Sequence, residues 1–411
     1  MKDTQLYAQI LGIEAPWRVI DVQLSLANDE VEVAVSHGGG GSLACPKCGE
    51  SCPGYDKRTR RWRHLDTCQL KTILVADVPR VECAEHGVVT IKVPWSEPGS
   101  GFTALFEALV IDWLQEATTS AVADRLRLSW NAVDGIMQRA VKRGLARRDV
   151  VAPTRLGVDE TSFQKRHEYV TVVSDHSEGG HVLYVADDRK TESLKGYLET
   201  LDEEETAGIE CISMDMWPAY IKAVHETIPH AESCIAFDKF HVAKYLGEAV
   251  DKVRRQEHRT LMANGDDLLK GSKYSWLRNP QNMSRKQWRE FAVLRESSLK
   301  TSRAWAIKEL AMSLWHYSTR GWALKAWKRW LGWAFRSRLE PIRRVARTIR
   351  EHLWGIINAI VLKADNGRSE AMNRKIQQIK SRACGFRNRE RFRNAIYFHL
   401  GGLDLYPAGV E

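Results

Sequence analysis

The sequence predicts a multidomain α/β protein in which a long all-α segment interrupts a mixed α/β core, and three observations support this prediction. The 411 residues are enough for two to four domains of roughly 150 residues each. Strand-like and helix-like runs follow one another from residue 153 to 238, whereas residues 239–362 contain helical patterns only. The first 150 residues combine a cysteine-rich segment with short amphipathic helices, which indicates separate small modules.

Changes in the sequence pattern divide the chain into six expected regions. Residues 17–36 alternate apolar and polar residues on either side of Asn28 and Asp29, which predicts two strands joined by a turn. The six regions are an amino-terminal β-hairpin region (1–42), a cysteine-rich module (43–100), a helical module (101–150), the first part of the α/β core (151–238), a helical insertion (239–362) and a final core helix with a basic tail (363–411).

The composition indicates a soluble protein that is attracted to polyanions. Lys and Arg number 61 against 52 Asp and Glu, which gives a formal net charge of +9. No apolar run approaches the roughly 18 residues of a membrane span, and the first residues lack the pattern of a signal peptide. Four of the eight cysteines lie between residues 45 and 68, unlike the even framework of a secreted disulfide scaffold. We therefore expect a cytoplasmic protein with reduced thiols and no membrane partner.

Two pairs of residues in the cysteine-rich module have the spacing of a structural zinc site. Each pair has a two-residue spacer: Cys45 with Cys48, and Cys83 with His86. Three sulfurs and one nitrogen form a closed tetrahedral Zn²⁺ site that has no open position for catalysis. A module of this size has little core of its own, so we expect one zinc ion to contribute folding energy. The alternative is a group of buried thiols, and the spare candidate ligands are Cys52 and Cys68.

Residues 102–148 have the apolar spacing of three amphipathic helices. Ser129 is a good N-cap for the third helix, whose apolar face includes Val133, Ile136 and Val141. Two short helices separated by a tight turn, followed by a third helix with a basic end, predict a helix-turn-helix. Such a motif places one helix in the major groove of DNA.

The α/β core begins with three consecutive strand-like runs, at residues 155–163, 168–175 and 181–188. They are followed by a helix at 192–201, a strand at 208–215, a helix at 218–227 and a strand at 232–237. A three-stranded meander followed by alternating helices and strands is the order of a ribonuclease-H-like domain. We expect its last helix to run from Ser369 to about Arg382.

Three acidic residues lie where this strand order brings distant chain segments together. We expect Asp159 at the end of the first strand, Asp215 at the end of the fourth strand, and Glu370 in the first turn of the last helix. Adjacent carboxylates repel one another unless divalent cations share them, and all-oxygen ligation suits Mg²⁺ or Mn²⁺. Two such ions, about 3.5 to 4 Å apart, support in-line phosphoryl displacement. Taken singly, each residue is more often a turn, cap or helix-dipole residue, but together they predict a catalytic site.

Basic residues are concentrated in several stretches. Residues 363–396 contain ten basic and three acidic residues and flank Glu370, where a cleaved strand must pass. A single basic face is usually a solvated surface, but several such faces beside a nuclease triad favour phosphate contacts. Tryptophans of the helical insertion are expected mainly in helix packing rather than in base stacking. The predicted DNA-contacting residues are Lys57, Arg58, Arg60, Arg61, Asn131, Arg139, Lys142, Arg143, Arg368, Arg374, Lys375 and Arg382.

Four motifs resemble the ISL-three family of bacterial insertion-sequence transposases, which use a DDE triad. They are GVDETSF, ISMDMWPAY, FDKFHV and NGRSEAMNRKI. The resemblance covers nearly the whole chain, because that family is similar in beginning with a cysteine zinc module and a helix-turn-helix and in carrying a long helical insertion before the Glu. The resemblance implies that Asp159, Asp215 and Glu370 are the triad.

Two details of these motifs leave roles open. Many DDE enzymes have a basic DNA contact two turns after the Glu, but position 377 is Gln, so on this interpretation Arg374 or Lys375 takes that role. Asp238 and His241 belong to the third motif, and a helix-capping Asp and a packed His are favoured there over catalysis.

We therefore expect a DNA transposase that binds the terminal inverted repeats of an insertion sequence, hydrolyses phosphodiester bonds with two Mg²⁺ or Mn²⁺ ions and joins 3′-hydroxyl ends to target DNA. Since both ends must be held at once, we expect a homodimer or higher homo-oligomer on double-stranded DNA, associated with the nucleoid of a bacterium. One alternative is a catalytically inactive DNA-binding regulator that keeps the zinc and helix-turn-helix modules. The other is a structure-selective nuclease without strand transfer.

Overall fold

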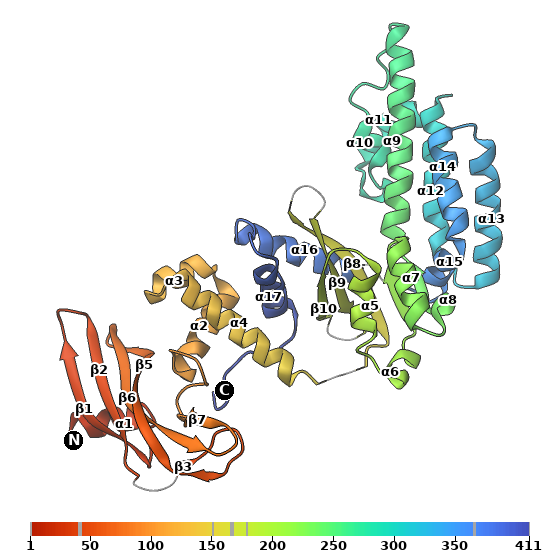
Figure 1. The fold of residues 1–411 in the computed structure, drawn as a ribbon. Helices are drawn as coiled ribbons and strands as arrows, with labels where there is room; N and C mark the ends of the chain where they lie inside the picture. Colours follow the sequence, from red (N-terminus) through yellow and green to blue (C-terminus); the bar gives the residue numbers. More distant parts are fainter. Residues whose placement is uncertain are drawn as a thin grey trace. The chain divides into compact units, whose positions relative to one another are not determined.

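The structure, a computed structural model, describes residues 2–39, 43–149, 152–164, 168–177, 180–364 and 367–410 (Figure 1). The chain forms two units: unit 1 comprises Met1–Asp149 and Tyr397–Glu411, and unit 2 comprises Val150–Ile396. The expected region boundaries at residues 42, 150 and 151 lie outside the described residues. None of the described helices is both long and apolar enough to cross a membrane.

Unit 1 contains a five-stranded sheet that joins the amino-terminal hairpin to the cysteine-rich region. The predicted hairpin forms from β1 (Trp17–Ser25) and β2 (Glu30–His37), and β2 also pairs in parallel with β6 (Leu70–Cys83). β5 (Gly54–Thr67) and β7 (Gly87–Thr90) pair antiparallel with β6. We expected residues 1–42 and 43–100 to form separate regions, but their strands share one sheet. The alternation of apolar and polar residues predicts a strand but does not show which strands pair.

Smaller elements complete this part of unit 1. A helix that the sequence analysis did not predict, α1 (Asp3–Ile10), precedes β1. β3 (Leu43–Ala44) and β4 (Ser51–Cys52) form a separate two-stranded sheet. The core of the large sheet contains three tryptophans in edge-to-face contact, with ring centroids 4.8 Å apart for Trp17 and Trp95 and 5.5 Å apart for Trp62 and Trp95.

The three helices predicted in residues 102–148 are present. They are α2 (Ala104–Glu116), α3 (Thr119–Leu126) and α4 (Trp130–Arg147). Each begins after a residue whose hydroxyl accepts a hydrogen bond from a backbone N–H of the first turn: Thr103, Thr118 and, as predicted, Ser129. These caps explain why three helices begin at short intervals along one stretch of chain.

The end of the chain packs on α4 within unit 1. Leu403 lies so close to Gly144 that a Cβ atom at position 144 would lie 2.6 Å from the Leu403 Cβ. Arg147 donates to a carboxylate oxygen of Asp404 at 2.8 Å, and the Tyr406 hydroxyl donates to Asp112 of α2 at 2.7 Å. We expected residues 363–411 to form a single region, but residues 397–410 belong to unit 1.

Unit 2 is built on a second five-stranded sheet with the order β10-β9-β8-β11-β12. β8 (Arg155–Gln164), β9 (Glu168–Asp175) and β10 (Val182–Asp187) form the predicted antiparallel meander, and β11 (Cys211–Met214) and β12 (Ile235–Phe237) run parallel to β8. The helices between strands are α5 (Thr191–Leu198), α6 (Glu203–Ala207), α7 (Pro218–Thr227) and α8 (Ala231–Cys234). The predicted strand at 232–237 was therefore wrong in its first half, where the chain forms α8.

Between residues 239 and 361, the described elements are all helical, as predicted. They are α9 (Lys239–Ala263), α10 (Lys273–Leu277), α11 (Arg285–Arg295), α12 (Lys300–Ser313), α13 (Arg320–Arg336), α14 (Glu340–Glu351) and α15 (Leu353–Val361), with 3₁₀ turns η1 (Pro280–Asn282) and η2 (Leu314–His316). α9 begins directly after β12 and runs the length of this helical segment (Figure 1). Trp305, Trp327 and Trp330 are buried between the helices, which confirms a packing role for them, whereas Trp322 is 63% exposed.

Two helices follow the helical segment. α16 (Gly367–Arg382) lies beside β8, and α17 (Arg389–Leu400) leads into the end of the chain. Phe392 of α17 is fully buried and its ring packs near Phe163 of β8, with centroids 5.8 Å apart. Both helices therefore return the chain to the sheet of unit 2 after the long helical segment.

Candidate functional site

Three aspartates lie at the same level on neighbouring parallel strands of unit 2. β11 pairs with β8 up to Ser213 opposite Gly157, and with β12 up to Met214 opposite Phe237. Continuing both registers places Asp215 beside Asp159 and beside Asp238, and the Asp238 N–H donates to the Met214 carbonyl at 3.0 Å. We call these three residues the acidic edge.

The structure corrects the predicted position of Asp159. We expected it at the end of the first strand, but it lies inside β8, which continues to Gln164. β11, the parallel neighbour of β8, ends at Met214, so Asp159 still lies at the level where the parallel strands end. Asp215 follows β11 directly, as predicted.

His241 and Tyr245 of α9 contact the acidic edge, and the sequence analysis did not assign this role to them. His241 Nδ1 lies 3.3 Å from Oδ2 of Asp215, and its Nε2 lies 3.8 Å from Oδ2 of Asp238. The Tyr245 hydroxyl donates to Asp215 at 3.4 Å. Asp238 also caps α9 by accepting from the N–H of Phe240 at 2.6 Å, which is the capping role favoured by the sequence. The four-residue spacing of His241 and Tyr245, which puts both on one helix face, was visible in the sequence.

α16 is fixed along β8 by three polar side chains on one helix face. Asn373 donates to Asp159, Gln377 donates to the Thr161 hydroxyl at 2.8 Å, and Lys380 donates to the Ser162 carbonyl at 2.7 Å. Gln377, which occupies the position where many DDE enzymes have a basic residue, thus contacts the sheet.

Glu370 lies on α16 one turn before Asn373, and its side chain is exposed. Asn373 in turn contacts Asp159, so α16 brings Glu370 to the side of the acidic edge. In the described part of the chain, the predicted triad is not among the groups whose metal-binding atoms all lie within 4.8 Å of one another. Mutual repulsion favours such separation among carboxylates.

The electrostatics of the acidic edge favour positive charge. Burial raises the pKa of Asp159 to about 6, and burial also raises the pKa of Asp238 to about 6, with further increases from the charges of Asp159 and Glu370. His241, when protonated, opposes both shifts. Burial and mutual repulsion disfavour the ionised form of these carboxyl groups, and a bound cation would stabilise that form. Carboxylate oxygens suit Mg²⁺ or Mn²⁺. The residues present therefore fit such an ion.

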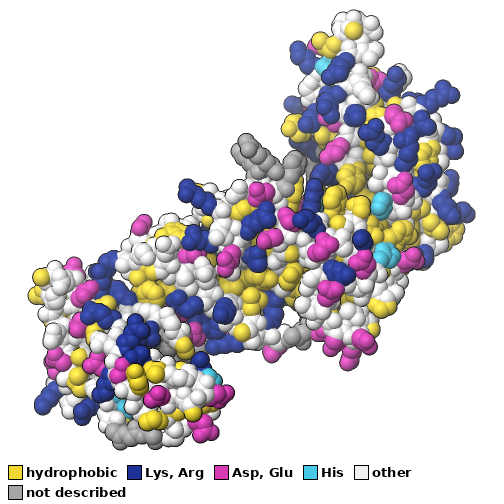
Figure 2. All heavy atoms as spheres, viewed as in Figure 1, with side chains coloured by type: hydrophobic (Ala, Val, Ile, Leu, Met, Phe, Trp, Pro, Cys, Tyr) yellow, Lys and Arg dark blue, Asp and Glu magenta, His cyan; other side chains and the backbone are white. Residues whose placement is uncertain are grey.

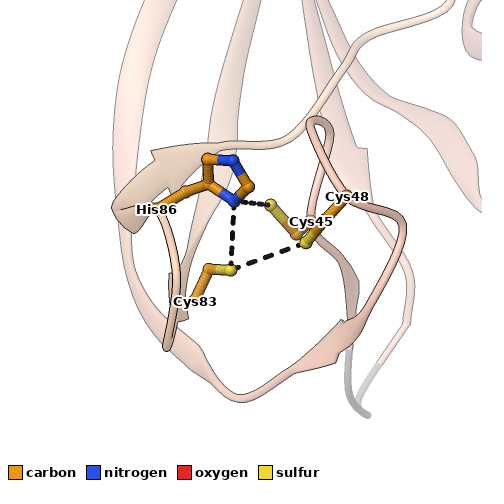
Figure 3. A group of neighbouring side chains, drawn as sticks. All are labelled: Cys45, Cys48, Cys83 and His86. Carbon is orange, nitrogen blue, oxygen red and sulfur yellow. Dashed lines mark hydrogen bonds between the residues drawn. The ribbon is translucent and has the colours of Figure 1, made fainter.

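A second cluster of ligand atoms lies in unit 1, where Cys45, Cys48, Cys83 and His86 bring their sulfur and nitrogen atoms all within 4.8 Å of one another (Figure 3). Sγ of Cys83 lies 3.7 Å from Sγ of Cys48 and 3.6 Å from Nδ1 of His86, and Sγ of Cys45 lies 3.9 Å from the same nitrogen. Zn–S bonds of about 2.3 Å in a tetrahedron place two sulfurs about 3.8 Å apart. The spacing of the cluster therefore fits one tetrahedral zinc ion.

The chain around this cluster presents the ligands from two turns. Cys45 and Cys48 follow β3, whereas Cys83 ends β6 and His86 lies in the turn before β7. Backbone N–H groups of His86 and Glu85 lower the pKa of Cys83 to about 7, which favours the thiolate that binds metals. The spare candidates, Cys52 and Cys68, are outside this four-residue set.

The predicted DNA contacts in β5 are on an exposed part of the strand. Lys57, Arg58 and Arg61 are exposed. Arg60 is half-buried, and its guanidinium donates to the Ser100 carbonyl at 3.2 Å. The basic run that we expected in a turn-rich module is therefore an extended strand with three exposed cations.

The predicted DNA contacts in α4 separate into two groups. Asn131 and Lys142 are exposed. Arg143 is only 9% exposed, and both it and Arg139 donate to the buried carboxylate of Glu107, at 3.1 Å and 2.6 Å. Both arginines compensate the buried charge of Glu107, so drawing either of them toward DNA would remove one of its two cationic partners. We therefore exclude Arg139 and Arg143 from the DNA surface proposed below.

On α16, Arg374, Lys375 and Arg382 are exposed, whereas Arg368 donates to the backbone carbonyls of His176 and Ser177. The structure also shows a basic surface that we did not predict, over α13 and α14 (Figure 2). Its signal was present in the sequence, because arginines occupy the face of α14 opposite its buried apolar residues. The exposed cations of this surface are Lys325, Lys328, Arg329, Arg343, Arg344, Arg347 and Arg350.

The structure combines a sheet with an acidic edge, a set of zinc ligands and three capped helices. This combination is typical of a transposase, and comparison with known families gives the same class. A family model described as a transposase, of the ISL3 type, matches residues 156–396. Two further models, described as the helix-turn-helix domain of transposase family ISL3 and as the zinc finger of transposases IS204/IS1001/IS1096/IS1165, match residues 91–141 and 42–86. The chain belongs to the ISL3 family of insertion-sequence transposases, and the resemblance stated from its motifs is thereby confirmed.

Curated relatives are similar along nearly the whole chain. A transposase for insertion sequence element IS1557 of Mycobacterium tuberculosis is 29% identical over 421 residues, covering 94% of this chain and 93% of the relative. A transposase for insertion sequence element IS1001 of Bordetella parapertussis is 27% identical over 374 residues, covering 90% of each chain. The similarity therefore includes the zinc finger, the helix-turn-helix and the α/β region together.

Proposed function

We propose that this transposase binds the terminal inverted repeats of its insertion sequence, hydrolyses phosphodiester bonds with two divalent cations and joins the freed 3′-hydroxyl ends to target DNA. The observation that supports this proposal is the common level of Asp159 and Asp215 on adjacent strands, together with the bond to Asp159 from Asn373, which lies one turn after Glu370 on α16. The antiparallel meander followed by two parallel strands supports a ribonuclease-H-like assignment of this sheet.

Asp159, Asp215 and Glu370 would hold two Mg²⁺ or Mn²⁺ ions, which supply activation of the attacking oxygen and stabilisation of the leaving oxygen in a phosphoryl transfer. The protein itself orients the carboxylates. Asn373 directs Asp159, and His241 and Tyr245 direct Asp215. We propose that these three residues position the ligands, because hydrogen-bonded carboxylates keep the geometry that a metal site requires.

We propose that the zinc finger and the helix-turn-helix hold the DNA ends. One structural zinc on Cys45, Cys48, Cys83 and His86 would fix the turns at the end of the sheet of unit 1, where Cys45 and Cys83 are already buried together. The exposed residues proposed to contact double-stranded DNA are Lys57, Arg58, Arg61, Asn131 and Lys142 in unit 1 and Arg374, Lys375 and Arg382 in unit 2.

The same proposal includes the assembly and the place of action. Since two ends must be processed together, we propose a homodimer or higher homo-oligomer on DNA. We place it in the bacterial cytoplasm, in association with the nucleoid, where both ends and target are found.

One assay separates this proposal from a regulator and from a structure-selective nuclease. The full-length protein is incubated with Mg²⁺ and labelled DNA that ends in the repeats flanking its gene. A transposase cuts at the repeat end and also produces joined products. Cutting without joining, or without preference for repeat ends, would indicate the nuclease, and uncut DNA would indicate the regulator.

A further inference from the structure

A cavity of about 1000 Å³ opens beside Glu370 in unit 2. It lies between the first turns of α9, the η2 turn, the end of α15 and the start of α16, and we call it the Glu370 cavity. Its volume is at the upper end of the roughly 300–1,000 Å³ of pockets that hold ligands the size of a drug or a nucleotide. The cavity is thus large enough for part of a DNA strand. None of the three aspartates of the acidic edge lines it.

The cavity has aromatic side chains that are not used in the core. Phe240 is 51% exposed and Tyr317 is 38% exposed, and both line the cavity. Elsewhere in the helical segment, Trp327 and Trp330 are buried in helix packing. Aromatic rings left at a cavity wall retain apolar faces that a flat ligand can cover.

The same cavity carries cations. Lys239 and Lys363 line it and are exposed, and neither forms an ion pair with another described residue. Glu370 also lines the cavity. A site with stacking faces, lysines and an acidic border resembles a nucleic-acid site more than a site for a small apolar molecule, because phosphates pair with lysines and bases stack on rings.

The cavity borders the proposed catalytic centre. The N–H of Phe240 donates to Asp238 of the acidic edge, and Glu370 belongs both to the cavity and to the proposed triad. A strand whose phosphate lies at the triad therefore has its neighbouring nucleotides within reach of the cavity. Bases within a duplex are stacked and paired, so an aromatic wall can stack only on bases that have left the duplex.

We propose that the Glu370 cavity binds unpaired bases of the DNA strand next to the cleaved phosphodiester. Phe240 and Tyr317 stack on these bases, and Lys239 and Lys363 contact the phosphates between them. The proposal rests on the proposed nuclease function of the same centre, and it adds the part of the substrate that must become single-stranded.

The test compares two unlabelled single strands as competitors for a labelled single-stranded DNA bound to the full-length protein without Mg²⁺. One competitor is a hexanucleotide of mixed sequence, and the other has the same backbone with abasic tetrahydrofuran residues. Stacking of a base on a protein ring contributes about 1–3 kcal/mol, so the wild-type protein should prefer the strand with bases by about tenfold or more. Phe240→Ala and Tyr317→Ala should each reduce this preference several-fold while binding of the abasic strand stays unchanged.

Trp322→Ala is the matched control, since Trp322 is an exposed aromatic residue of the same helical segment outside the cavity. It should keep the full preference, and Phe240→Tyr should restore most of it. If both cavity variants keep the wild-type preference for bases, the proposal is wrong. Cleavage of repeat-ended DNA by the wild-type protein is measured in parallel: absence of cleavage refutes the nuclease function, whereas normal cleavage with an unchanged base preference refutes only the cavity site.

Discussion

At the scale of single residues, Asp215 is the carboxylate of the acidic edge that two side chains of α9 contact. His241 lies 3.3 Å from one of its oxygens, and the Tyr245 hydroxyl donates to it from the next turn of α9. Asp238 stands on the other side of His241 and also caps that helix. The first turns of α9 thus orient Asp215. Replacing the side chains that contact it should therefore weaken metal binding more than it lowers the stability of the fold.

Replacing His241 by Ala should weaken metal binding. Ligand-orienting residues typically affect metal affinity or activity about 10–100-fold, so we expect Mn²⁺ affinity to fall by about tenfold or more, with a lower kcat and unchanged DNA binding. His241→Asn, which keeps an N–H donor, should recover part of the loss. Calorimetric titration with Mn²⁺ measures this directly, and His225→Ala is a control on α7. An unchanged Mn²⁺ affinity in His241→Ala would show that the histidine only packs.

His64 makes unit 1 sensitive to acid. Burial, with a smaller contribution from the charge of Arg63, lowers the pKa of His64 to about 4, and its Nδ1 lies 2.9 Å from the hydroxyl of Thr103, the N-cap of α2. Because the folded pKa lies below the ordinary value of 6.5, the stabilising contribution is present above pH 6.5 and is lost as the pH falls toward 4. The full contribution is on the order of 3 kcal/mol.

Urea unfolding between pH 7 and pH 4 measures this dependence. His64→Gln cannot be protonated, so its free energy of unfolding should fall less with acid than that of the wild type. Acid release of metal affects both proteins alike and cancels in the comparison. Parallel pH profiles for the two proteins would contradict the assignment.

At the scale of elements, the sequence predicted most strands and helices and the pairing of neighbouring strands, but not the pairing of strands far apart in the chain. The strands β8 to β10 and the helix α7 agree closely with the predicted ranges, because period-two alternation and Pro218 at the helix start are local features. The short helices α1 and α8 were missed, since helices of one or two turns depend on tertiary packing. The parallel pairing of β2 with β6 has no local signature.

The zinc finger is the element whose stability should depend most on an added ligand. Cys83→Ser should reduce zinc content from about one ion per chain to near zero and should lower the unfolding temperature of unit 1, because metal binding contributes folding energy. Cys68→Ser changes an exposed cysteine outside the four-residue set and should retain the metal. Zinc content and thermal unfolding are measured on both proteins. Full zinc content in Cys83→Ser would overturn the ligand assignment.

At the scale of the whole molecule, the sequence predicted that Asp159 and Asp215 lie near each other on adjacent strands, but it did not predict which surface cations are free to contact DNA. Asp159, Asp215 and Glu370 were selected because their positions in the strand order converge. The DNA surface was chosen from charge alone, and charge does not show which cations have internal partners. Arg143 illustrates this limit, since it bonds the buried Glu107 and also donates to the carbonyl of Leu405 near the end of the chain. Partners so far apart in sequence become visible only in the folded chain.

The acidic edge is also the part of the molecule on which the proposed enzymatic function depends. Cleavage of labelled repeat-ended DNA in Mg²⁺ by Asp159→Asn tests it most directly. The matched control is Glu199→Gln, which changes an exposed acid directly after α5. We predict that Asp159→Asn binds the repeat ends with wild-type affinity and leaves them uncut, while Glu199→Gln cuts normally. Cleavage by Asp159→Asn at the wild-type rate would contradict the account.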